Sequence, residues 1–218
     1  MARILYKLER RFGRFAIQNL MLYIVITMFA VFICNIVAPD LYVSQYLYLD
    51  RDAIFRGEVW RLITFIFLPT SSSPIWIIFS LYFYFLIGKY LDEAWGSFKF
   101  NVYYLLGMIC TIISALIVGY ADNGFLNLSL FFAFAVLFPD FEVRIFFIIP
   151  IKIKYLAYLD AAYYVVMLII GTWSIRAEIL ASLVNFFIFF GGDIIKKIRS
   201  ELYYRKTRAN FRKNNWGR

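Results

Sequence analysis

The feature that most constrains this chain is a succession of apolar runs long enough to cross a bilayer. A helix of about 20 apolar residues spans the roughly 30 Å hydrocarbon core of a membrane. Hydrophobic residues make up 63% of the chain, against roughly 45–50% in soluble domains, and the mean hydropathy is +0.72. The chain of 218 residues has room for about six such spans and no sizeable soluble domain. The sequence therefore predicts an all-α polytopic membrane protein.

Six spans are predicted, at about residues 16–37, 74–91, 100–119, 123–138, 155–171 and 179–195. Pro74 suits the first turn of the second span, with Ser73 as its cap. The fourth span reaches only roughly 22 Å, so its neighbours must shield it or the bilayer must thin around it. The segment 144–154 is apolar but short and is broken by Pro150. We expect that segment to lie at the interface or to be partly re-entrant.

Basic residues favour the cytoplasmic side of a membrane. Of the 23 Lys and Arg residues, 19 lie in the two terminal segments and in the segments that follow the second and fourth spans. The other side would hold only Arg51, Arg56, Arg61 and Arg176. An odd number of spans would place the two basic ends on opposite sides. The charge pattern predicts six spans with both termini in the cytoplasm, and the expected location is a bacterial cytoplasmic membrane.

The chain divides into three expected parts, which are a basic amphipathic segment at 1–15, a membrane domain at 16–195 and a basic tail at 196–218. The first segment suits a helix in the headgroup layer, because its apolar residues fall near one face. The tail mixes basic and aromatic residues. Such a tail can dock on nucleic acid or a ribosome, but a topology anchor touching anionic lipid is preferred. The lipid bilayer is thus an expected partner, and nucleic acid is not.

One short segment carries a recognisable pattern, the run GEVWR at residues 57–61, followed by LITF. Trp60 can bury its ring at an interface while its N–H stays in water. Arg61 can snorkel or pair with Glu58. The segment resembles the W-R loop of rhomboid intramembrane proteases and of their non-proteolytic relatives, the derlins. The resemblance implies a loop half-embedded in the outer leaflet after the first span.

Other parts of the chain follow the same family in order and spacing. The run IGKYLDEAWG at 87–96 is similar to the end of the family's second span, and the fourth span ends in AVLFP. An apolar stretch with a proline, FFIIP, comes next and is followed by the fifth span, as in that family. The agreement extends over about residues 16–195. The resemblance therefore implies a six-helix rhomboid-like bundle.

The catalytic residues of rhomboids are missing. In that family a serine in a G-x-S-G turn of the fourth span attacks and a histidine of the sixth span takes its proton, since such a nucleophile needs a base. This chain contains no histidine. Ser129 is flanked by leucines and Ser182 lies about where the histidine belongs. Trp76 and Ser80 are the nearest counterparts of the family's His and Asn in the second span. We expect no catalytic residues and an inactive, pseudoprotease-like protein.

Other chemistry finds little support. Cys34 and Cys110 lie in apolar runs without metal-ligand spacing, so neither a metal nor a cofactor is expected. Asp160 and Asp193 faintly resemble the pair of intramembrane aspartyl proteases. However, Asp160 is close in sequence to basic residues at 152 and 154, and pairing with them at the interface would explain it.

The resemblance to derlins implies a protein that binds transmembrane segments of client proteins, in quality control or assembly of membrane proteins. Polar groups within the spans can hydrogen-bond to a guest helix or between the protein's own helices. The candidates for client contact are Ser80, Asn127, Ser129, Ser182 and Asn185. Two alternatives stay open. One is a transporter or lipid-handling protein, although no inverted repeat is visible, and the other is an intramembrane protease with a non-standard site.

Overall fold

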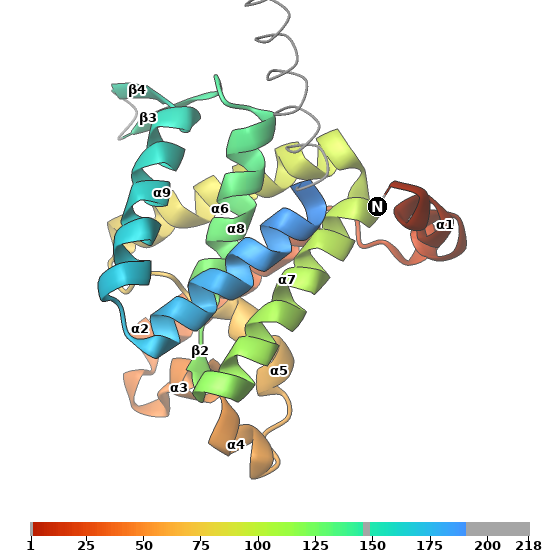
Figure 1. Ribbon diagram of the computed structural model, residues 1–218. Helices are drawn as coiled ribbons and strands as arrows, with labels where there is room; N and C mark the ends of the chain where they lie inside the picture. Colours follow the sequence, from red (N-terminus) through yellow and green to blue (C-terminus); the bar gives the residue numbers. More distant parts are fainter. Residues whose placement is uncertain (1, 146–148, 191–218) are drawn as a thin grey trace, which may run out of the picture.

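The computed structural model describes residues 2–145 and 149–190 and is mainly helical (Figure 1). Its main helices are α1 (Ala2–Phe12), α2 (Leu20–Val37), α6 (Pro74–Trp95), α7 (Ser97–Val118), α8 (Gly124–Leu137), α9 (Ile153–Ile170) and the helix Trp173–Phe190. Five of these helices are long and apolar enough to cross a membrane. The chain is therefore an integral membrane protein. The sixth apolar helix, α8, has 14 residues and is about 21 Å long.

The helix ends differ from the predicted spans in detail. α2 begins after Asn19, whose left-handed backbone (φ 53°) separates it from the segment before. α6 begins at Pro74 as predicted, but the expected cap is wrong, because the Ser73 side chain makes no capping hydrogen bond. The last helix begins at Trp173, earlier than predicted. Residues 191–195 of the predicted sixth span, with Asp193, fall outside the described residues, as does the basic tail.

Two contacts establish the relative directions of helices α2, α6 and α7. The short strands β1 (Leu49–Asp50) and β2 (Tyr120–Ala121) pair antiparallel, so the segment after α2 meets the segment after α7 at one end of the bundle. At the opposite end, the side-chain amide of Asn101 in α7 donates to the carbonyl of Ile17, just before α2, at 2.9 Å. Consequently α2, α6 and α7 run in alternating directions.

α8 then returns through the bundle. Tyr90, near the end of α6, packs its ring against those of Phe134, Phe138 and Phe141, with centroids 5.0–6.0 Å apart. The end of α8 therefore lies beside the end of α6. The segment expected to be interfacial or partly re-entrant contains two antiparallel strands, β3 (Glu142–Ile145) and β4 (Ile149–Lys152), and β4 leads into α9.

The short helix α8 is shielded by its neighbours, as its length requires. It contacts α6, α7 and α9 and lies between α7 and α9 in Figure 1. Its side chains at Leu126, Leu130 and Phe134 are at most 1% exposed. Close packing around it depends on Gly107 of α7, where a Cβ would lie 2.3 Å from the Leu126 Cδ1 atom.

The N-terminal helix α1 stands outside this bundle (Figure 1). It is tied to the start of α7 by an ion pair between Glu9 and Lys99, at 3.8 Å. Its apolar side chains Leu8 and Phe12 are exposed. This arrangement is compatible with the predicted place of the segment in a headgroup layer.

Candidate functional site

The segment between α2 and α6 folds into three short helices, α3 (Val43–Leu47), α4 (Arg51–Phe55) and α5 (Arg61–Thr64). Arg61 is buried, with 7% of its surface exposed. Its Nε donates to the Glu58 carboxylate at 2.6 Å, so of the two possibilities for Arg61 the structure shows the pair with Glu58. Its Nη1 also donates to the carbonyls of Gln45 and Tyr48, at 2.7 and 2.9 Å. Arg61 thereby holds the end of α3 against α5, which is an architectural role.

Trp60 serves the same local architecture. Its indole N–H donates to the carbonyl of Tyr46 at 3.3 Å, while the ring remains half-exposed. Asp50 caps α4 by accepting the Ala53 N–H at 3.0 Å, and this hydrogen bond lowers the pKa of the Asp50 carboxyl. Hydrogen bonds from Trp60 and Arg61 thus join the short helices of this loop, and the half-exposed Trp60 ring lies at its surface.

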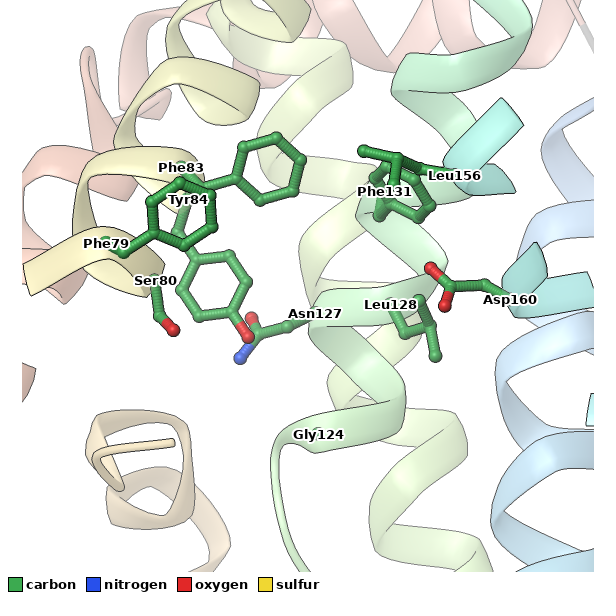
Figure 2. A pocket seen from close by; sticks show the side chains of 10 residues that line it. All are labelled: Phe79, Ser80, Phe83, Tyr84, Gly124, Asn127, Leu128, Phe131, Leu156 and Asp160. Carbon is green, nitrogen blue, oxygen red and sulfur yellow. The ribbon is translucent and has the colours of Figure 1, made fainter. Parts of the chain in front are cut away.

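A groove runs over α8 between α6 and α9, with a volume of about 270 Å³ (Figure 2). Its walls are aromatic and aliphatic. Phe79 and Phe83 come from α6, Phe131 from α8 and Leu156 from α9. The rings of Phe83 and Phe131 are in tilted contact, with centroids 5.8 Å apart. Ligand sites commonly combine such apolar walls with a few polar groups.

Polar groups lie within these walls. Asn127 on α8 is only 1% exposed, and neither atom of its amide forms a hydrogen bond with the described part of the chain. The Tyr84 hydroxyl points toward this amide (Figure 2), and the two groups interact electrostatically, although neither Asn127 atom reaches hydrogen-bond geometry. Ser80 also lines the groove, and its hydroxyl donates back along α6 to the carbonyl of Trp76 at 2.8 Å. The groove therefore contains an amide whose donor and acceptor both lack a geometrically complete hydrogen bond with the described residues.

Asp160 of α9 also lines the groove, and its carboxylate points toward α8 (Figure 2). The predicted pairing of Asp160 with nearby lysines is wrong. Lys152 and Lys154 both pair with Asp140, at 3.6 and 2.7 Å. Within residues 2–145 and 149–190, no Lys or Arg forms an ion pair with Asp160. The sequence had indicated Asp160 as an ionisable residue within a span, but the expected pairing with lysines removed it from the candidate contact residues.

The opposite face of α8 carries a closed polar cluster, in which the Asn185 Oδ1 atom has no hydrogen-bond partner in the described part of the chain. Asn185, in the helix Trp173–Phe190, donates its amide N–H to the Ser129 Oγ at 3.2 Å. The Tyr103 hydroxyl of α7 donates to the Ser129 carbonyl at 3.0 Å and lies within hydrogen-bond distance of the Ser129 Oγ. Ser129 and Asn185 are at most 1% exposed. The groups around the Ser129 hydroxyl are thus a phenol and an amide, and neither is a base suited to activate it.

The predicted contact residues therefore separate into two groups. Ser80 and Asn127 share the groove, whereas Ser129 and Asn185 bond to each other inside the bundle. Ser182 is also buried, and its hydroxyl has no hydrogen-bond partner in the described part of the structure. Positions 127 and 129 differ by about 200° around the helix axis, which places them on opposite faces of α8.

Other chemical groups are scattered. Among the described residues, no three His, Cys, Asp or Glu side chains gather in a way that could hold a metal ion. Cys34 and Cys110 are both free thiols.

A scan against models of known protein families gave no match, and a search of curated proteins gave none either. The fold and the groove place this chain in a general class of protein. It is a helical integral membrane protein with an apolar groove between its helices, and polar side chains line part of that groove.

Proposed function

We propose that this chain is a catalytically inactive, rhomboid-like membrane protein that binds transmembrane segments of other membrane proteins in the groove over α8. The observation that carries this proposal is the buried Asn127 amide, whose hydrogen-bonding atoms are unused at the base of the groove. An unpaired amide is costly in an apolar medium. A guest helix that supplies a polar partner removes that cost once the Asn127 side chain turns toward the groove, and interhelical hydrogen bonds of this kind contribute about 0.5–2 kcal/mol.

The dimensions of the groove favour a helix that lies alongside the bundle. A volume of about 270 Å³ accommodates side chains from one face of a guest, and the guest backbone would remain in lipid. The flanking helix α9 presents large apolar side chains outward, among them Val165 and Ile169, with 58% and 69% of their surfaces exposed. A hydrophobic guest would extend that contact by van der Waals packing, which is what drives helix association in lipid.

The alternation of the helices supports a six-span topology in which α8 crosses as a shortened, shielded helix. α1, Lys89, Lys99 and the β3–β4 hairpin then share one end of the bundle, while Arg51 and Arg61 share the other. By the positive-inside rule the first end is cytoplasmic. The proposed location is a bacterial cytoplasmic membrane, with the loop of Trp60 at the outer leaflet.

Reconstitution in liposomes with single-span test proteins examines binding and cleavage together. An active rhomboid protease serves as positive control for cleavage. The proposal predicts that test proteins photo-crosslink to the groove of this protein and yield no cleavage product. A product that disappears in Ser129→Ala or Asp160→Asn would establish a protease instead. A flux of solute or lipid without any crosslink would favour a transporter or lipid-handling protein.

A further inference from the structure

We propose that Asp160 makes the groove selective for transmembrane helices that carry a lysine or arginine within the membrane. This inference rests on the proposed function and deepens it, because it states which guests the groove prefers. Asp160 is half-buried in the wall of a groove at the level of the spans. An ionisable side chain there is costly in lipid unless it is paired.

The partner that Asp160 lacks is a cation. The two lysines nearest in sequence are both held by Asp140 at the turn between α8 and β3. No other Lys or Arg of residues 2–145 and 149–190 pairs with Asp160. A basic residue in a lipid-embedded guest has the complementary problem, since it too needs an opposite charge to remain within the bilayer. Charge complementarity therefore favours a cationic guest over an acidic or purely apolar one.

The surroundings of Asp160 suit an ammonium or guanidinium group. Asn127 lines the same groove, and its buried amide oxygen accepts no hydrogen bond within residues 2–145 and 149–190 (Figure 2). In Figure 2 this amide lies beside Tyr84 on the α6 side of α8, whereas Asp160 points toward α8 from the α9 side, so the two groups offer a guest separate polar contacts. The rings of Phe79, Phe83 and Phe131 line the remaining surface, and aromatic faces attract cations. An apolar guest side chain would leave both the carboxylate and the amide without partners.

The position of Asp160 also predicts where the guest's charge must lie. Asp160 lies about two helical turns after Ile153, or roughly 10 Å from the end of α9 that adjoins the β3–β4 hairpin. A guest lysine at the same depth would lie about seven residues inside the corresponding end of its span. The flexible lysine stem tolerates a displacement of about one turn. A lysine near the opposite end of the guest would not reach.

The test uses liposomes containing the full-length protein and a fluorescent 20-residue Leu-Ala guest helix, with affinity measured by energy transfer. Four guests differ only at the predicted depth, where they carry Lys, Gln, Leu or Glu, and a fifth carries its Lys near the opposite end. The wild-type protein should bind the correctly placed Lys guest about tenfold more tightly than the Leu guest. Asp160→Asn should reduce this preference to about twofold or less while the affinity for the Leu guest stays unchanged.

Two further variants guard against indirect effects. Asp160→Glu retains the charge and should retain the preference for the Lys guest. Glu93→Gln removes the same charge at the exposed end of α6, outside the groove, and should change nothing. Equal binding of Lys and Leu guests by the wild type, or a Lys preference that survives Asp160→Asn, would overturn the inference while the proposed function stands. Failure of every guest to bind would overturn the proposed function and the inference with it.

Discussion

The two faces of α8 each carry a buried polar side chain, and they differ in whether the side chain that α8 itself contributes is hydrogen-bonded. On the face toward α7, Ser129 bonds to Tyr103 and Asn185 and is sealed inside the bundle. On the face toward α6 and α9, Asn127 is equally buried but has no hydrogen-bond partner in the described chain. The first arrangement stabilises the protein's own helix packing. The second arrangement leaves the Asn127 amide available to a binding partner, and we therefore assign the binding function to this face of α8.

The difference also separates stability from binding. A polar group that is paired within the bundle contributes to folding, and its removal lowers the free energy of unfolding. A polar group that is buried and unpaired costs folding energy, and its replacement by an apolar side chain can be neutral or stabilising. Substitutions on the two faces should therefore change stability in opposite directions.

The largest effect is expected where the closed face is packed most tightly, at Gly107. In Gly107→Ala the new Cβ would lie 2.3 Å from Leu126 Cδ1 and 2.9 Å from Asn185 Nδ2. Overpacking of this kind costs about 1–3 kcal/mol, and unfolding by SDS titration in mixed micelles measures it. The matched control is Gly13→Ala, whose Cβ would meet only the Glu9 Cγ atom at 3.7 Å. Equal stability of the two variants would show that the closed face is loose.

The next effect concerns the hydrogen bonds of the closed face. Ser129→Ala removes the hydroxyl that accepts the Asn185 N–H, and leaves that buried amide without this partner. The expected loss is about 0.5–2 kcal/mol of unfolding free energy, measured by the same titration. Guest binding in the groove should be unchanged. If Ser129→Ala left stability unaltered but abolished guest binding, the assignment of the two faces would be reversed.

On the face of α8 toward α6 and α9, a substitution should change the unfolding free energy in the opposite direction. Asn127→Leu replaces an unpaired amide by an apolar side chain of similar size, so the unfolding free energy should stay equal or rise by up to about 1 kcal/mol. Crosslinking to guest helices with a polar residue should fall at the same time. A marked loss of stability in Asn127→Leu would mean that the amide is paired within the fold, and the central contrast between the faces would fail.

The smallest effect should come from the charges at the turn between α8 and β3, where Asp140 pairs with Lys154 and Lys152. The hydrogen bond from Lys154, and then the charge of its ammonium, lower the pKa of the Asp140 carboxyl. A carboxyl whose pKa is lower in the folded protein stabilises above its unfolded pKa of about 3.9 and loses that contribution as the pH falls through the folded value.

The melting temperature compared between wild type and Asp140→Asn should therefore differ slightly at neutral pH. The two proteins should converge as the pH drops below the folded pKa of Asp140. The effect is small because the carboxylate is exposed and water screens the pair. A difference that grew on acidification would contradict this origin.

Much of the architecture was predictable, because apolar runs reveal membrane helices directly. The shortness of α8 and the Arg61–Glu58 pair were both visible in the sequence, the first from the length of the run and the second from local spacing. The division of polar residues between two faces was less accessible. The helices are apolar nearly all round, so their periodicity does not say which side faces a neighbour.

The partners of charged residues were the least predictable part. Lys152 and Lys154 lie closer in sequence to Asp160 than to Asp140, but the β3–β4 hairpin folds them back onto Asp140. Tyr103 reaches Ser129 across a separation of 26 residues, which local spacing cannot reveal. These contacts depend on the packing of whole helices, and they decide which polar groups remain free for a guest.

The most direct test of the account places a photo-crosslinking benzophenone side chain at one position in each of two variants. Phe79 lies in the groove wall, whereas Phe29 on α2 is an exposed aromatic residue outside it. Both variants are reconstituted with the same single-span test protein and irradiated. The account predicts crosslinked product from position 79, a several-fold lower yield from position 29, and reduced product at position 79 when Asn127 is replaced by Leu. Equal yields from the two positions, unaffected by Asn127→Leu, would contradict a binding site in the groove.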